Sequence, residues 1–319
     1  ASTGTAITSL SGAALTSASM AAVGPAGLTL LTAAGAGLGG KTGFGLANAY
    51  LKDIPDYEFL FRRGATVDNG HRVLVINGFL TEKNNDAEDW CKGLENRYMK
   101  SPVWYLNWES KTLHDLGTML ANCGSGILTK QAAKKGIGVA SKKLVKSVAR
   151  GGWMMTAAQL AGNPWHAAMI NAQKSGALLA EAISRTEGKT FTLMGHSLGA
   201  RVVFFALLAL ATKEQKNENA YVRDVVLMGG AVGREDAEQW ELVTDAVSGK
   251  IYNCYTENDM VLSFLYQGAN LGMSKPAGLD DVEYTSDKIH NKSFSSMIDG
   301  HSEWKNDLPA VLEELELDD

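Results

Sequence analysis

A serine flanked by glycines offers the clearest chemistry in this sequence. Residues 195–199 read Gly-His-Ser-Leu-Gly, a G-x-S-x-G element with Ser197 at its centre. Residues 190–194 before it predict a short buried strand, and residues 199–212 after it predict an apolar helix. A sharp turn from strand to helix lifts a serine hydroxyl above the sheet, so Ser197 is the predicted nucleophile. The alternative is a serine that only caps the helix.

A catalytic serine needs a base to take its proton and a carboxylate to orient that base. In hydrolases built around such a turn, the chain order is serine, then acid, then histidine. Asp259 follows a predicted strand at 250–255 and is the predicted acid, with Glu257 as the alternative. His301 lies in a Gly-His loop before the last predicted helix and is the predicted base. We interpret His290 as an exposed loop residue.

The same reasoning predicts an oxyanion hole and a substrate pocket. One N–H donor is expected from Leu198, directly after the serine, and the other from Phe79 or Leu80 after the first predicted strand. Gly78 lets this loop turn its amides inward. Gly78, Leu80 and His196 are expected to border the substrate pocket.

The elements around these residues alternate between strand and helix. Strands are predicted at 72–77, 103–107, 190–194, 222–228 and 250–255, and helices from about 86, at about 235–247 and at about 303–315. This alternation predicts an α/β fold with a doubly wound, mostly parallel sheet.

Two further segments divide the chain. Residues 1–50 are Gly/Ala-rich, uncharged through residue 40, and are predicted to form a helical arm, and residues 51–319 are predicted to form the catalytic domain. That domain contains a helical insertion at about 110–188 whose middle is basic and which could act as a lid. A membrane surface is the partner expected for residues 1–40 and for the insertion, although a solvated basic helix is the simpler interpretation of the latter.

Residues 35–42 in the arm also fit the phosphate-loop pattern G-x-x-x-x-G-K-[ST]. A phosphate loop needs a β-branched strand before it, and residues 31–34 make a poor one. Nucleotide binding through Lys41 is therefore the weaker interpretation of this segment.

Composition excludes several other classes. The net charge of −5 argues against general nucleic-acid binding. The three cysteines, at positions 91, 123 and 254, have neither a disulfide framework nor metal-ligand spacing and suit a reducing compartment. We predict no metal and no cofactor.

Several motifs resemble one known family. The similar segments are Gly195 to Val202 at the strand-to-helix turn, Ile76 to Leu80, Trp104 to Glu109, Asn163 to Trp165, Ser248 to Phe264, and Gly300-His301. The family is the transmembrane and coiled-coil domain-containing protein 4 family, also called domain of unknown function 726. The chain departs from that pattern with His196 in place of phenylalanine and Phe79 in place of tryptophan.

The resemblance implies an α/β-hydrolase fold with a triad of Ser197, Asp259 and His301, and a membrane-embedded N-terminal stretch. The predicted function is a serine esterase of the lipase, phospholipase or lysophospholipase type, acting on lipid esters. The alternative is a catalytically silent hydrolase fold that binds lipid or membrane. A membrane-associated, cytoplasmic or exported bacterial protein would each fit this sequence.

Overall fold

The computed structural model describes residues 57–65, 69–78, 87–108, 164–213, 221–270 and 275–317. The predicted arm at 1–50, the phosphate-loop pattern, and the predicted insertion up to residue 163 lie outside these ranges.

The described strands form one seven-stranded sheet in the order β1-β3-β2-β4-β5-β6-β7. Their bounds are β1 Tyr57–Arg63, β2 His71–Ile76, β3 Val103–Trp108, β4 Thr190–His196, β5 Val222–Met228, β6 Ile251–Tyr255 and β7 Ile289–Ser293. β1 pairs antiparallel with β3, and every other pair is parallel. All parallel strands therefore end at one edge of the sheet, where loops can gather functional side chains.

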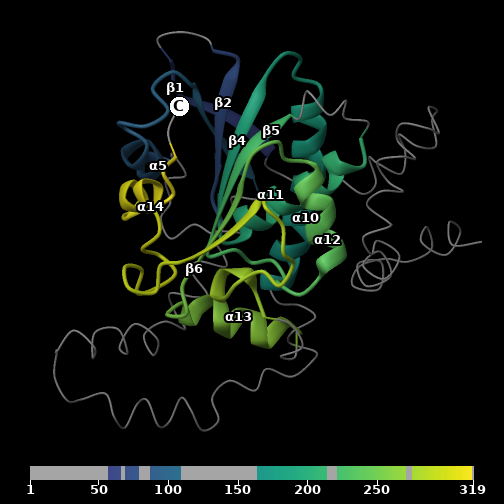
Figure 1. Ribbon diagram of the computed structural model, residues 1–319, viewed down its shortest axis with the longest axis vertical. Coiled ribbons are helices and arrows are strands. Elements are labelled where there is room, and N and C mark those ends of the chain that lie inside the picture. Colours follow the sequence, from purple (N-terminus) through teal and green to yellow (C-terminus); the bar gives the residue numbers. More distant parts are fainter. Residues whose placement is uncertain are drawn as a thin grey trace, which may run out of the picture.

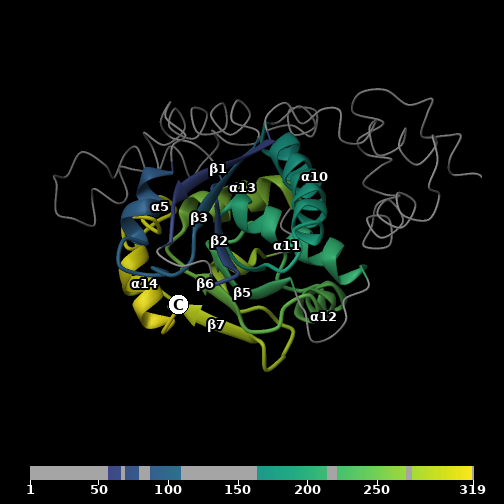
Figure 2. The ribbon, with the colours of Figure 1, turned by 90° about the horizontal axis from the view of Figure 1, so that it is seen from above.

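Helices cover both faces of this sheet (Figure 1). Their bounds are α5 Glu88–Gly93, α10 Pro164–Ser184, α11 Leu198–Ala211, α12 Ala237–Asp245, α13 Met260–Asn270 and α14 Leu308–Glu314, with a short 3-10 helix at Ala277–Leu279. In Figure 2, α5 and α14 lie on one side of the sheet, and α10, α11 and α12 lie on the other.

The strands supply a core to each helical layer because successive side chains point to opposite faces. In β2, Leu74 and Ile76 belong to the core that contains α10 and α11, whereas Val73 and Val75 belong to the core beneath α5 and α14. Such continuous apolar runs are typical of parallel strands buried on both faces.

This strand order, with its central parallel strands and a strand-to-helix turn after β4, is an α/β-hydrolase fold. The predicted doubly wound, mostly parallel sheet is confirmed. Helix α10 lies within the stretch that was predicted to be helical.

The edge strands β1 and β7 and the helix α13 were not predicted. β1 and β7 flank the sheet, and both are only partly buried. The interpretation of His290 as a loop residue was wrong: it lies in β7, and its ring centroid is 5.5 Å from that of Tyr252. An edge strand is half solvated and can therefore be as polar as a loop, which is why residues 288–292 were not recognised as a strand.

The last helix begins later than predicted. Residues 301–307 form turns, and α14 starts at Leu308 with a proline, Pro309, in its first turn. Proline fits the first turn of a helix because the N–H that it lacks has no intrahelical partner there. The predicted base therefore lies in a run of turns ahead of α14.

Candidate active site

The turn between β4 and α11 places Ser197 in a strained conformation. Its backbone has φ 59° and ψ −118°, which residues with a side chain rarely adopt. The Ser197 N–H donates to the carbonyl of Met228 at 2.9 Å, and its carbonyl accepts from the N–H of Ala231 at 3.2 Å. The segment after β5 thus holds the turn, and such over-determined strain is typical of functional residues.

Two positions at this turn must be glycine because a Cβ atom there would overlap neighbouring atoms. A Cβ atom on Gly199 would lie 2.2 Å from the carbonyl oxygen of Ile76. A Cβ atom on Gly78 would lie 2.5 Å from the Cβ of Ser197. The backbone that follows β2 therefore packs directly against the turn at Ser197, and no larger residue fits at position 78 or 199.

Three predicted side chains meet at the carboxyl edge of the sheet. His301 Nε2 lies 2.8 Å from Ser197 Oγ, and His301 Nδ1 is hydrogen-bonded to Asp259 Oδ2. The exposed fractions of the three residues are 1% for Ser197, 3% for His301 and 0% for Asp259. Glu257, the alternative acid, is exposed.

The position of Asp259 at the start of α13 holds its carboxylate. Its Oδ1 accepts the N–H of Leu262 at 2.8 Å, and its carbonyl accepts the N–H of Ser263 at 3.1 Å. The carboxylate thus caps a helix N-terminus, where backbone N–H groups favour negative charge. One oxygen is fixed by the helix, which leaves the other to orient His301.

Two side chains that were not predicted to belong to the site connect the segment before Asp259 to the segment before His301. Asn258 Nδ2 donates to the carbonyls of Ser295 and Ile298 at 2.7 and 3.2 Å. Thr256 Oγ1 donates to the same Ile298 carbonyl at 2.8 Å. The segments that carry acid and base are therefore fastened to each other as well as to the sheet.

The loop predicted to complete the oxyanion hole is anchored at its first residue. Trp90 Nε1 donates to Asn77 Oδ1 at 2.6 Å, and Trp108 Nε1 donates to the Asn77 carbonyl at 3.0 Å. Phe79 and Leu80 lie outside the described residues. Leu198 is the first residue of α11, directly after Ser197.

His196, predicted to border the pocket, is buried with its ring against the His301 loop. Its Nε2 donates to the backbone carbonyl of His301 at 2.9 Å, and the two ring centroids are 4.9 Å apart. Burial is the main cause that holds the pKa of His196 well below its usual value, and the neighbouring side chains of His301 and Lys305 lower it further. The ring is therefore neutral at physiological pH.

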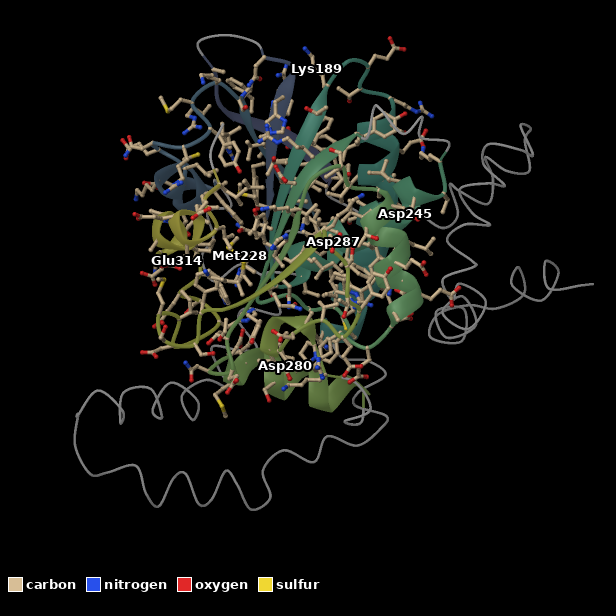
Figure 3. The ribbon with its side chains drawn as sticks, in the orientation of Figure 1. Lys189, Met228, Asp245, Asp280, Asp287 and Glu314 are labelled. Carbon is tan, nitrogen blue, oxygen red and sulfur yellow. The ribbon has the colours of Figure 1, made fainter. Side chains whose placement is uncertain are left out.

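Figure 3 labels Met228, the last residue of β5, whose backbone pairs with that of His196. Lys189, just before β4, lies at the top, and Asp280 lies at the bottom beside α13. The site occupies the lower edge, where the parallel strands end. Across the described ranges, no group of three or more His, Cys, Asp and Glu residues could hold a metal ion.

A comparison with known protein families identifies the family to which this chain belongs. A model for a family of proteins of unknown function, DUF726, matches residues 1–318. The chain belongs to the DUF726 family. This match confirms the resemblance carried by the elbow and the flanking motifs.

Relatives of this DUF726 chain include proteins described as membrane or transmembrane proteins and a probable lipase. It is 30% identical to an uncharacterized membrane protein of Caenorhabditis elegans, over 75% of this chain and 39% of that protein. It is 28% identical to the transmembrane and coiled-coil domain-containing protein STS1 of Oryza sativa, over 82% of this chain and 39% of that protein. It is 25% identical to the probable lipase MIL1 of Saccharomyces cerevisiae, over 76% of this chain and 22% of that protein.

The DUF726 chain thus spans at most about two fifths of the length of these relatives. Among solved structures it is similar to a lipase-esterase related protein from Clostridium acetobutylicum, with a TM-score of 0.37 and 11% identity over 82% of this chain and 98% of that one. The strand order and the nucleophile turn carry the fold assignment. Within the described ranges of this DUF726 chain, every helix is too short or too polar to cross a bilayer.

Proposed function

We propose that this chain is a serine hydrolase that cleaves carboxylic esters, with Ser197 as nucleophile, His301 as base and Asp259 as the acid that orients the base. One observation carries the proposal: a continuous contact from the Asp259 carboxylate through both ring nitrogens of His301 to the Ser197 hydroxyl. Ser197 lies on a strained strand-to-helix turn, which is how α/β-hydrolases present a nucleophilic serine.

The proposed reaction passes through an acyl-enzyme. His301 Nε2 takes the hydroxyl proton while Ser197 Oγ forms a bond to the acyl carbon, and the carbonyl electron pair moves onto oxygen. The amides of Leu198 and Phe79 are proposed to hold this oxyanion. His301 returns the proton to the departing alcohol, and a water molecule, activated by the same imidazole, releases the acid.

Lipid esters are the proposed substrate class. The support is the resemblance of the chain to a probable lipase and to membrane proteins. We propose that the uncharged segment 1–40 and the basic insertion meet the membrane surface that presents the substrate, without a metal or a cofactor.

The test is labelling by a fluorophosphonate together with hydrolysis of a phospholipid, lysophospholipid and triglyceride panel. The unsubstituted chain is expected to be labelled and to turn over at least one lipid ester, and Ser197→Ala to lose both. Asp259→Asn should lower kcat about 10⁴-fold, because the amide favours the wrong imidazole tautomer.

Ser248→Ala is the matched control, since its hydroxyl donates to the Val222 carbonyl at the opposite edge of the sheet. This variant should be labelled and active like the unsubstituted chain. Liposome binding with no turnover of any ester would instead support the silent, lipid-binding alternative, and labelling that survives Ser197→Ala would contradict the proposed nucleophile.

A further inference from the structure

The base of the proposed triad lies on irregular backbone. Residues 301–307 are turns, and no strand ladder fixes the position of His301. Its ring must nevertheless reach Ser197 and Asp259 at once, and catalytic geometry tolerates errors of only about 0.5 Å. The backbone of His301 therefore needs a local support.

The His196 side chain supplies a direct bond to that backbone. His196 is the last residue of β4, and its backbone is paired in register with Met228 of β5. Its Nε2 lies 2.9 Å from the carbonyl oxygen of His301, and the residue is 3% exposed. A residue adjacent to the nucleophile thus reaches across the site and contacts the main chain of the base.

The chemistry of this bond defines the protonation of the His196 ring. A carbonyl oxygen only accepts, so His196 Nε2 must carry the proton. The ring is buried 4.9 Å from that of His301, which becomes positively charged during the proposed reaction. A neutral donor supports the His301 backbone without repelling that charge.

We infer that His196 is a positioning residue for the proposed base: its Nε2–H donates to the main-chain carbonyl of His301 and sets the reach of the His301 ring to Ser197. This inference rests on the proposed function and adds to it a role for the residue directly before the nucleophile. The proposed base remains His301, because its Nε2 contacts the Ser197 hydroxyl, whereas His196 Nε2 contacts a carbonyl.

Three substitutions separate positioning from packing. His196→Phe keeps a ring of similar size and removes the donor. His196→Gln places an amide N–H close to the position of Nε2, whereas the amide of His196→Asn is one methylene shorter and cannot reach the carbonyl. We expect kcat for a soluble p-nitrophenyl ester to fall about 10- to 100-fold in the phenylalanine and asparagine variants, with KM unchanged. The glutamine variant should stay within about 3-fold of the unsubstituted chain.

A second measurement does not depend on turnover. The proton shared by His301 Nδ1 and Asp259 should give a far-downfield NMR resonance, because hydrogen bonds to a carboxylate are short and strong. We expect this resonance to persist in His196→Gln and to broaden or shift in His196→Phe. Thermal melting of each variant shows that it is folded, and if the phenylalanine variant does not fold, the glutamine and asparagine pair carries the comparison.

The outcomes distinguish this inference from the function on which it rests. An unsubstituted chain that is neither labelled nor active would contradict the proposed function. An active chain in which His196→Phe keeps its full kcat and its downfield resonance would overturn the positioning role alone. Equal losses in the folded phenylalanine and glutamine variants would also overturn it, since packing and not donation would then explain the loss.

Discussion

A buried histidine lies near each end of β4 and contacts two side-chain oxygens there: His71 of β2 at the amino end, and His301 from the turns before α14 at the carboxyl end. At the amino end, His71 Nδ1 and Nε2 lie 3.0 Å from the hydroxyls of Thr190 and Thr192. At the carboxyl end, His301 contacts the Ser197 hydroxyl and the Asp259 carboxylate. Burial and hydroxyl contacts are common to both, so neither of them makes a histidine a base.

The difference lies in the partners and in the backbone. Both threonines lie within strand β4, whereas Ser197 lies in the turn that follows it, at φ 59°. At the carboxyl end one partner is a carboxylate, which stabilises an imidazolium, whereas two hydroxyls do so weakly. The comparison indicates that a carboxylate and a strained, presented hydroxyl together distinguish a candidate base from a structural histidine.

The largest expected effect comes from exchanging each histidine for glutamine. His301→Gln should lower kcat by about 10⁴- to 10⁶-fold, because glutamine cannot accept the serine proton. His71→Gln should keep kcat within about 2-fold and lose about 1–2 kcal/mol of stability through its hydrogen bonds to threonine. Ester hydrolysis and urea unfolding measure the two quantities, and a large kcat loss in His71→Gln would break the distinction.

A glycine near each end of β4 extends the comparison to the backbone. Gly199→Ala should destabilise the chain by about 3 kcal/mol, because its Cβ would lie 2.2 Å from a backbone oxygen. Gly188 has φ +64°, and a Cβ added there would meet no heavy atom within 4 Å, so Gly188→Ala should cost only the strain of about 1 kcal/mol. Urea unfolding measures both effects, provided that the dependence of the unfolding free energy on urea concentration is the same in both variants. Equal losses of stability in Gly199→Ala and Gly188→Ala would show that the turn at Ser197 has room for a Cβ atom.

The smallest expected effect is a pH dependence of the unfolding free energy that comes from His196, at the carboxyl end of β4. The pKa of His196 is depressed in the folded chain, mainly by burial, so below its usual value of 6.5 the unfolded chain binds a proton that the folded chain does not. Stability from this group is complete above about pH 6.5 and falls by up to about 1.4 kcal/mol per pH unit as the pH decreases toward the folded pKa. His196→Gln should remove this component, seen as a flatter profile of unfolding free energy between about pH 5 and 6.5. Parallel profiles for the two proteins would contradict a buried neutral ring.

Short-range patterns predicted much of the site, because glycine spacing and strand–helix context act locally. The order of serine, acid and histidine then directed attention to Asp259 and His301, which the fold brings into contact. Contacts between residues far apart in the sequence have no local pattern that predicts them. Examples are the hydrogen bonds from Asn258 to the carbonyls of residues 295 and 298, and from His196 to the carbonyl of residue 301. The edge strands β1 and β7 escaped prediction because half-solvated strands lack the continuous apolar pattern of β2 or β5.

The pair of indoles that meet at Asn77 offers a way to observe the site optically. Trp90 and Trp108 come from different elements, yet both direct their N–H groups at this one residue beside Gly78. Indole emission responds to the hydrogen bonding of its nitrogen, so a movement of the strand end next to Ser197 would change the fluorescence of two native chromophores. Two of the seven tryptophans of the chain thus report on the strand end beside Ser197, with no dye attached.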